Sequence, residues 1–143
     1  MSHLITPKII NNDNRGSMQS IFDDNIKNVS HIISEAETIR SNHYHLTDWH
    51  YILVLNGEID YFFGDIDCEL DDLKYIKVNS SKCIYTPNRE FHVTYFPKRT
   101  EILVFNGQAR DQNIYEDDLV RRDLVKNENI HSLLNKFNAK RSV

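Results

Sequence analysis

The sequence predicts an all-β protein, a barrel or sandwich of short strands followed by a short C-terminal helix. From about residue 16 to residue 107, short runs rich in β-branched and aromatic residues recur at roughly ten-residue spacing. Clusters of turn-forming residues separate these runs, and helical spacing of apolar residues follows only near the C-terminus. A chain of 143 residues has the length of one domain. We therefore expect a single domain over residues 1–143, with its barrel at about 16–107.

Short apolar runs mark the strands of this barrel. Among the turn signals between them, Asn56-Gly57 is the strongest, because both residues tolerate the positive φ of a type I′ turn. It predicts a hairpin between its flanking strands. The predicted strands are 29–34, 50–55, 58–63, 73–78, 83–86, 92–96 and 101–105.

The chain past Gly107 is polar, with apolar residues that return at helical spacing. Ile130, Leu133, Leu134 and Phe137 would share one face of a helix. We expect a short helix at about 128–138 that packs this face on the barrel or on a partner subunit.

Composition excludes several classes of function. The chain has 17 Lys and Arg against 21 Asp and Glu, a net charge of −4, which argues against nucleic acid as a partner. We find no signal peptide and no run of the roughly 20 apolar residues that span a membrane. Cys68 and Cys83 form no CxxC motif, as in proteins of a reduced compartment. We expect a cytoplasmic protein without a membrane partner.

Three histidines precede an apolar strand. Side chains two apart on a strand share a face, so His43 and His45 project together if their segment is extended. His50 opens the next strand, in step with Ile52 and Val54, whose face is the interior. If that strand runs beside the first, the three imidazoles converge.

A fourth histidine, His92, opens a later strand after a proline and a polar turn. Imidazole nitrogens suit zinc, iron, nickel, copper and manganese to differing degrees. We therefore predict one divalent transition metal ion per chain, such as zinc, iron, nickel or manganese, with further coordination positions open to water or substrate. Its ligands would be His43, His45, His50 and His92. The alternative is that each histidine is placed separately in the fold.

The spacing of these residues resembles the cupin family. The cupin pattern is HxH, three or four residues, a glutamate, six residues and a glycine, then a second motif with a proline five residues before a histidine. Here His43-Tyr44-His45 is followed by His50 in the glutamate position, and then by Gly57. Pro87 precedes His92 by five residues. The resemblance covers about residues 30–107 and implies a jelly-roll β-barrel with the metal inside.

Three positions depart from the cupin pattern. His50 replaces the glutamate, which implies an all-histidine site with one fewer negative charge. Glu37 stands where a glycine is expected six residues before the HxH, and Arg89 replaces the glycine of the second motif. We expect the turns at these two positions to be affected.

Two segments resemble a narrower group, the nucleotide-sugar cupins. "DNRGSM" (Asp13 to Met18) and "IRSNHYH" (Ile39 to His45) look like segments of the dTDP-4-keto-6-deoxyhexose 3,5-epimerases and the related 3,4-ketoisomerases. The tail from Ala109 to Arg121 is similar to that of epimerase-like cupins of surface-polysaccharide biosynthesis.

The narrower resemblance implies roles for single residues. Arg15 and Arg40 would contact the phosphate or sugar of the substrate, and His43 would be the base beside a ketone if no metal is bound. The 3,5-epimerases have no metal and carry glutamine where His45 stands. With metal bound, His43 becomes a ligand, and the base is a metal-bound hydroxide or a tyrosine such as Tyr85. The alternatives are a capped turn for Arg15 and a salt bridge at the barrel rim for Arg40.

The sequence thus favours a metal-binding cupin that acts on a carbohydrate, as a sugar-nucleotide epimerase or isomerase. One alternative is an iron- or nickel-dependent oxygenase of a small molecule, and another is a binding module without catalysis. Because jelly-roll cupins commonly pair their sheets, we also expect a homodimer in which residues 4–11 add to the neighbour's sheet edge.

Overall fold

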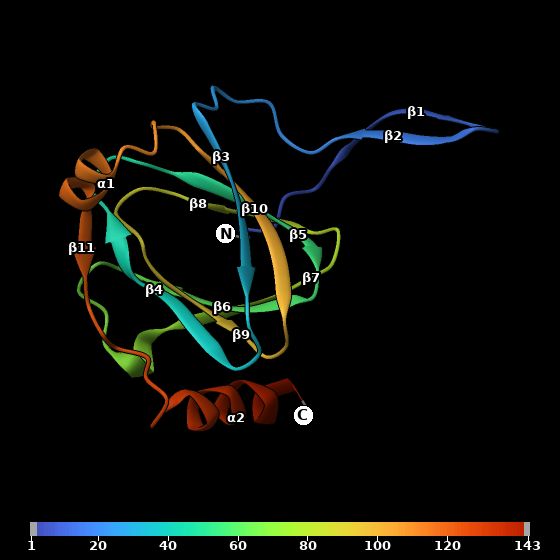
Figure 1. Ribbon diagram of the computed structural model, residues 1–143. Coiled ribbons are helices and arrows are strands. Elements are labelled where there is room, and N and C mark those ends of the chain that lie inside the picture. Colours follow the sequence, from blue (N-terminus) through green and yellow to red (C-terminus); the bar gives the residue numbers. More distant parts are fainter. Residues whose placement is uncertain (1–2, 142–143) are drawn as a thin grey trace.

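Two antiparallel β-sheets face each other in the computed structural model, which describes residues 3–141 (Figure 1). The four-stranded sheet has the order β3 (Asn28–Ser34), β10 (Thr100–Asn106), β5 (His50–Asn56), β8 (Cys83–Thr86). The five-stranded sheet has the order β11 (Leu119–Arg121), β4 (Thr38–His45), β9 (Phe91–Phe96), β6 (Glu58–Gly64), β7 (Lys74–Asn79). This architecture confirms the predicted all-β, jelly-roll-like fold.

The alternating sequence pattern places the core between the two sheets. All seven predicted strands are present, and their ends lie within one residue of the prediction. Ile52 and Val54 of β5 pack with Ile59 and Tyr61 of β6 in one buried cluster that also includes Phe96. A core of this size stabilises the barrel because each fully buried apolar side chain contributes about 1.5–3 kcal/mol.

The connection at Asn56-Gly57 differs from the prediction. It does not close a hairpin, since β5 belongs to the four-stranded sheet and β6 to the five-stranded sheet. The glycine is needed for a corner between the sheets. Gly57 has φ +110, and a Cβ at this position would lie 2.8 Å from the backbone Cα of Thr100. The turn chemistry was read correctly, but the chain leaves one sheet there for the other.

Both positions where cupins carry glycine keep the backbone conformation of glycine. Glu37 has φ 65 and Arg89 has φ 56, in the left-handed region. The two turns therefore keep their shape. The effect of replacing glycine is strain, because Glu37 and Arg89 occupy a backbone conformation that is unfavourable for residues with a side chain.

The C-terminal segment covers the barrel at two places. α2 (Ile130–Arg141) is the predicted helix, beginning two residues later than expected, and its Ile130 and Leu133 pack in a cluster with Phe62 and Tyr95 of the five-stranded sheet. A short helix, α1 (Gln112–Asp118), and the strand β11 precede it and were not predicted. A 3₁₀ turn, η1 (Leu70–Asp72), lies before β7. None of the helices described between residues 3 and 141 is long and apolar enough to cross a membrane.

The N-terminal part does not join the barrel as expected. β1 (Lys8–Asp13) and β2 (Gly16–Ser20) form a two-stranded hairpin that projects from the barrel (Figure 1), so the sheets begin at β3 and not at residue 16. Before the hairpin, Ile5 donates its backbone N–H to Cys83, and Tyr85 donates to His3. Residues 3–5 thus extend the edge of β8 within the same chain.

Candidate active site

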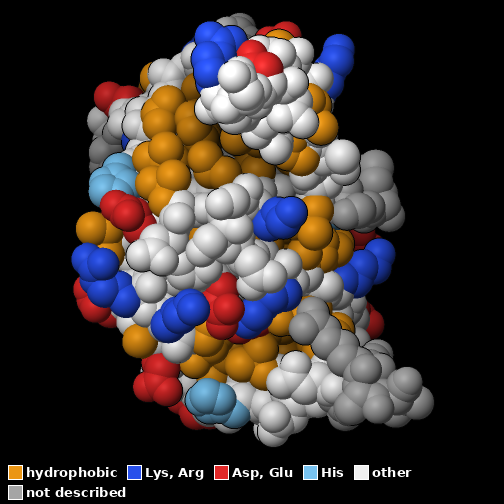
Figure 2. Space-filling model, turned by 90° about the vertical axis from the view of Figure 1, so that its right-hand side faces the viewer, with side chains coloured by type: hydrophobic (Ala, Val, Ile, Leu, Met, Phe, Trp, Pro, Cys, Tyr) orange, Lys and Arg blue, Asp and Glu red, His pale blue; other side chains and the backbone are white. Residues whose placement is uncertain are grey.

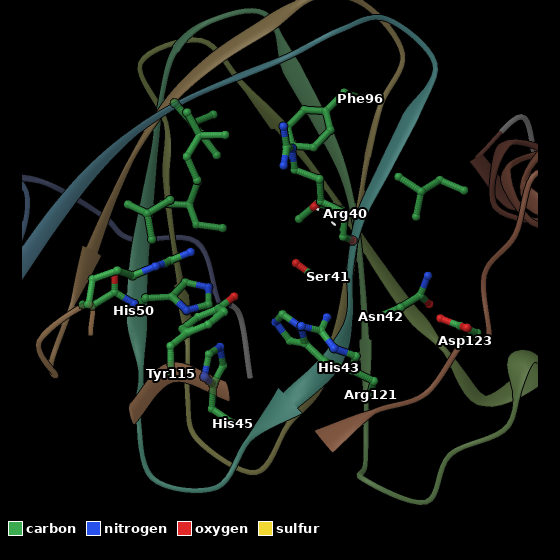
Figure 3. Close-up of a pocket in the computed structure, with 18 residues that line it drawn as sticks. Arg40, Ser41, Asn42, His43, His45, His50, Phe96, Tyr115, Arg121 and Asp123 are labelled. Carbon is green, nitrogen blue, oxygen red and sulfur yellow. Dashed lines mark hydrogen bonds between the residues drawn. The ribbon is translucent and has the colours of Figure 1, made fainter. Parts of the chain in front are cut away.

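A cavity of about 460 Å³ opens between the two sheets (Figure 3). At one end it is lined by His43, His45 and His50, and Figure 3 shows Tyr115 and Arg121 beside them. Apolar side chains form part of its other walls, from Ile32, Ile39, Ile52, Phe96, Ile102 and Val104. A concave site with apolar walls and a few convergent polar groups is the usual form of a small-molecule site.

A bulge in β4 brings both Arg40 and the HxH histidines to the wall of this cavity. Ser41 and Asn42 have φ values of 75 and 60, and the pairing of β4 with β9 shifts between Ser41 and His43. As a result Arg40 and His43, three residues apart, both line the cavity. Beyond the bulge, His43 pairs with His92 of β9.

Three of the predicted ligands lie together. His43, His45 and His92 are buried, and each offers a ring nitrogen within 4.8 Å of the others. Their ring centroids are 5.0 Å apart for His43 and His45, and 4.8 Å apart for His43 and His92. The HxH spacing on one strand and the histidine of the second motif therefore meet as predicted.

His50 reaches this group from another direction. β5 does not run beside β4 but lies in the opposite sheet, so His50 approaches across the barrel. Its ring centroid is 5.2 Å from that of His92 and 5.6 Å from that of His45. His50 is buried beside the cluster but is not one of the three residues with mutually close nitrogens.

Burial keeps the imidazoles neutral. Loss of solvation, together with the neighbouring rings, lowers the pKa of His43 to about 2, and loss of solvation lowers the pKa of His92 to about 3. The same causes lower the pKa of His50 well below its usual value. His43 Nδ1 and His92 Nε2 are buried without a hydrogen-bond partner. Each is a polar atom that a bound ligand would satisfy.

The residues present fit a divalent transition metal. Neutral imidazole is a good ligand for zinc, iron and nickel, and three such rings with two unpartnered nitrogens leave room for further ligands. His43, His45 and His92 would hold the ion, with His50 next to them. A metal there would supply a Lewis acid to an oxygen of the substrate.

Three arginines give the cavity a positive balance. Arg40, Arg110 and Arg121 line it together with one carboxylate, Asp123, and Arg121 also pairs with Glu116, outside the lining, at 3.1 Å. Arg40 donates from Nε to Ser34 Oγ at 2.7 Å and from Nη2 to the Ile33 carbonyl at 3.3 Å. These hydrogen bonds tie Arg40 to β3, in place of the salt bridge at the barrel rim that was the alternative. Figure 3 shows Arg40 beside Phe96, away from His45.

The structure does not bring Arg15 to this cavity. Arg15 lies in the turn of the β1–β2 hairpin, with its side chain 82% exposed and paired with Asp13 at 2.7 Å. Its backbone N–H also donates to Asp13 Oδ1. Arg15 thus takes part in a capped turn, which was the alternative to a role in substrate binding. Within one chain, Arg15 is too far along the projecting hairpin to contact a ligand in the cavity.

Tyr85 does not line the cavity either, and a different tyrosine, Tyr115, does. Side chains alternate along β8, so Ile84 and Thr86 are buried inward while Tyr85 packs outward, with its ring 4.9 Å from that of Tyr51. Tyr115 of α1 lines the cavity, with its ring 5.9 Å from that of His45. Arg110 stacks over the Tyr115 ring at 4.1 Å.

No sequence signal marked Tyr115, Arg110 and Arg121 individually. They come from a polar segment without periodicity, and only the likeness of its tail to epimerase-like cupins pointed to it. Their place over the cavity depends on the pairing of β11 with β4.

No protein-family model and no curated protein matches the sequence, whereas solved structures match the fold well. A variant of the 3,4-ketoisomerase QdtA from Thermoanaerobacterium thermosaccharolyticum, in complex with TDP, is 26% identical, with a TM-score of 0.63 over 83% of this chain and 86% of that one. A 3,4-ketoisomerase from Helicobacter canadensis is 17% identical, with a TM-score of 0.64 over 96% of both chains. The dTDP-4-dehydrorhamnose 3,5-epimerase of Sulfolobus tokodaii is 18% identical, with a TM-score of 0.60 over 78% of this chain and 72% of that one.

These likenesses agree with the two facing sheets and with the resemblance read from the motifs. The chain has the cupin-like fold of the RmlC-like sugar 3,4-ketoisomerases and dTDP-sugar epimerases.

Proposed function

We propose that this protein is a sugar-nucleotide isomerase of the 3,4-ketoisomerase or epimerase type, acting in surface-polysaccharide biosynthesis. The observation that carries the proposal is a cavity in which buried, neutral imidazoles lie with three arginines, in a fold whose solved neighbours hold TDP or TDP-4-keto-6-deoxyglucose. The cavity chemistry and these neighbours point to the same class of substrate.

The arginines suit the nucleotide part of such a substrate. A diphosphate carries concentrated negative charge, and the guanidinium group recognises phosphate oxygens with paired N–H donors. Arg40, Arg110 and Arg121 outnumber the two carboxylates near them, Asp123 in the lining and Glu116, which pairs with Arg121. The apolar walls suit the less polar faces of the base and the deoxysugar.

The imidazoles suit the chemistry. In a 3,4-ketoisomerisation, a base removes the proton from the carbon beside the ketone, and the ketone oxygen takes a proton to give an enediol. Loss of the other hydroxyl proton and protonation of the former ketone carbon complete the shift. In a site without metal, a neutral imidazole of the His43–His45 pair serves as the base, and the Tyr115 hydroxyl is the group placed to protonate oxygen.

Turnover of TDP-4-keto-6-deoxyglucose tests this proposal. We expect ¹H NMR of the nucleotide sugar, mixed with the purified protein, to show conversion to the 3-keto isomer. A panel of 4-keto-6-deoxyhexose nucleotides left unchanged by the folded protein would contradict it.

A second proposal concerns metal, and it is the alternative to base catalysis by these imidazoles. We infer that one divalent transition metal ion binds to His43, His45 and His92, with His50 beside it, because two of these rings have buried nitrogens without partners. Elemental analysis of purified protein should find about one ion per chain. His50→Ala should lower that content if His50 is a ligand, and an unchanged content would restrict the ligands to the other three.

We also propose a homodimer, in which the hairpin packs on a second copy. Ile9, Ile10 and Met18 of the hairpin are 65%, 60% and 58% exposed, and an isolated two-stranded hairpin is only marginally stable. Figure 2 views the molecule from the hairpin side and shows hydrophobic side chains gathered around the hairpin. A hairpin docked on a second copy would carry Arg15 toward that copy's barrel, where it would act as predicted.

The two cysteines support a cytoplasmic location, which we propose together with this function. Cys68 and Cys83 are both buried free thiols, as is usual in a reducing compartment.

A further inference from the structure

Asn106 is a buried residue of the cavity lining that uses only one end of its side-chain amide. It ends β10 and is 2% exposed. Its Nδ2 donates to Asp48 Oδ2 at 3.1 Å, whereas its Oδ1 is buried and has no hydrogen-bond partner among residues 3–141. A buried carbonyl oxygen without a donor is costly, so an oxygen of this kind in a binding cavity indicates a ligand that supplies the donor.

Asp48 fixes the orientation of this amide. Its side chain is buried, and its other oxygen, Oδ1, accepts from the backbone N–H of Trp49 at 2.8 Å. Because carboxylate oxygens accept hydrogen bonds, the amide must turn its NH₂ group to Asp48. A flipped amide would place two acceptor oxygens 3.1 Å apart. Asn106 is therefore held with its carbonyl oxygen free to accept.

The other amide of the cavity lining, Asn42, differs in this respect. It donates from Nδ2 to the Val125 carbonyl at 2.9 Å, and its Oδ1 accepts from Val125 N at 3.1 Å. Both ends of Asn42 thus bond to the backbone that follows β11. Of the two amides, Asn106 is the one with an acceptor left for a ligand.

The position of Asn106 places this oxygen near the sugar of the proposed substrate. Asn106 pairs with His50 between β10 and β5, and the ring centroid of His50 lies 5.6 Å from that of His45. Since the isomerisation takes place at the imidazoles, the sugar and not the nucleotide base occupies this end of the cavity. On a 4-keto-6-deoxy sugar the hydroxyls donate hydrogen bonds, whereas the ketone only accepts them. The sugar carbon that lies at Asn106 must therefore carry a hydroxyl.

We infer that Asn106, held by Asp48, is a substrate-binding residue whose Oδ1 accepts a hydrogen bond from the hydroxyl on carbon 2 or carbon 3 of the sugar. The inference rests on the proposed function and deepens it, since it names the group of the substrate that is recognised. It also gives the selectivity a direction. A hydroxyl is bound at this point, and a ketone is excluded because two acceptor oxygens would face each other.

Binding of nucleotide sugars that cannot isomerise tests the inference without turnover. Isothermal titration calorimetry compares TDP-glucose, TDP-2-deoxyglucose, TDP-3-deoxyglucose and TDP on the wild type and on Asn106→Ala. We expect one of the two deoxy sugars to bind the wild type about 3-fold to 10-fold more weakly than TDP-glucose, as for the loss of a neutral hydrogen bond. In Asn106→Ala this difference should vanish, while TDP binds both proteins alike. Asn79→Ala, at an exposed asparagine that ends β7, is the matched control and should keep the difference.

A second variant covers the case in which Asn106→Ala does not fold because it leaves the buried Asp48 carboxylate unpaired. The double variant Asp48→Asn, Asn106→Ala removes that charge and should lack the difference as well. Equal affinities of the wild type for the three sugars would overturn the inference and leave water as the partner of Oδ1. A difference that persists in the folded alanine variant would also overturn it.

Turnover of TDP-4-keto-6-deoxyglucose is measured separately, so the two proposals can fail separately. A wild type that shows the Asn106-dependent difference but leaves this substrate unchanged would refute the proposed isomerisation and support the role of Asn106. A wild type that converts the substrate without such a difference would refute the role of Asn106 alone.

Discussion

The four imidazoles at the inner end of the barrel have different partners, and these decide what each ring can do. His45 has the carboxylate of Asp118 at Nδ1. His92 contacts the Glu90 carbonyl through Nδ1 at 3.1 Å and has an unpartnered Nε2, and His43 has an unpartnered Nδ1. His50 contributes a buried ring from the opposite sheet. Proton transfer is thus best supported at His45 in a site without metal, whereas a bound metal would take His43, His45 and His92 as its ligands.

The depressed histidine pKa values make stability fall with acidification. Between pH 6.5 and about 3, the unfolded chain binds protons at His43 and His92 that the folded chain does not, so unfolding is favoured as the pH falls. Each such histidine contributes a slope of about 1.4 kcal/mol per pH unit in that window. Urea unfolding of chelator-treated protein at pH 7.5, 6 and 5 measures this dependence of the free energy of unfolding on pH. Equal free energies of unfolding at the three pH values would contradict the buried, neutral rings.

Arg40 should affect substrate binding more than catalysis. Arg40→Ala removes a guanidinium from the cavity wall, and we expect the KM to rise about 10-fold to 100-fold, since a hydrogen bond to a charged group is worth about 1.5–3 kcal/mol. Arg99→Ala is the control, because Arg99 is exposed and pairs loosely with Glu35 at 3.8 Å. Equal KM values for the two variants would remove Arg40 from the site.

At the scale of single elements, periodicity explains what the sequence could predict. The two-residue period of a strand placed His43 and His45 on one face, and the apolar face of β5 gave His50 its inward direction. Pairing partners are not encoded in periodicity, which is why β5 was expected beside β4 and Asn56-Gly57 was read as a hairpin. The segment of α1 and β11 has no period at all, so Tyr115 and Asp118 were found only from the fold.

Two turns keep a glycine conformation with another residue in it, which gives a prediction about stability. A non-glycine residue in the left-handed region costs about 1–2 kcal/mol, while glycine loses about 0.5–1 kcal/mol more conformational entropy on folding. We expect Glu37→Gly and Arg89→Gly each to raise the free energy of unfolding by about 0.5–1 kcal/mol, measured by urea denaturation. Glu37→Val should lower it, because a β-branched side chain fits this region poorly. A glycine variant less stable than the valine variant would contradict the observed φ.

The whole molecule is a pair of facing sheets with one hairpin that the sheets do not support. The two sheets enclose the cavity, and α2 packs on the outer face of the five-stranded sheet. The β1–β2 hairpin stands apart with apolar residues on its surface, and β3 is an edge strand with Val29 and Ile33 also exposed. Edge strands and apolar hairpins of this kind are usually covered by another chain.

Size-exclusion chromatography with light scattering tests the proposed dimer. We expect the wild type to have the mass of two chains, and the double variant Ile9→Lys, Ile10→Lys to be a folded monomer, because it places two charges in the interface. Ile66→Lys is a matched control at an exposed apolar residue away from the hairpin. A monomeric wild type would contradict the dimer and leave Arg15 without a site.

The central claim is that the histidine cavity moves a proton at a carbon beside a ketone. Incubation of the protein with TDP-4-keto-6-deoxyglucose in D₂O, followed by NMR and mass spectrometry of the sugar, measures this directly. We predict that deuterium enters at that carbon with the wild type and that this rate falls at least about 100-fold in His45→Gln, since a positioned general base contributes roughly 10²–10⁴-fold. No deuterium above the protein-free control, from a folded wild-type protein, would contradict the account.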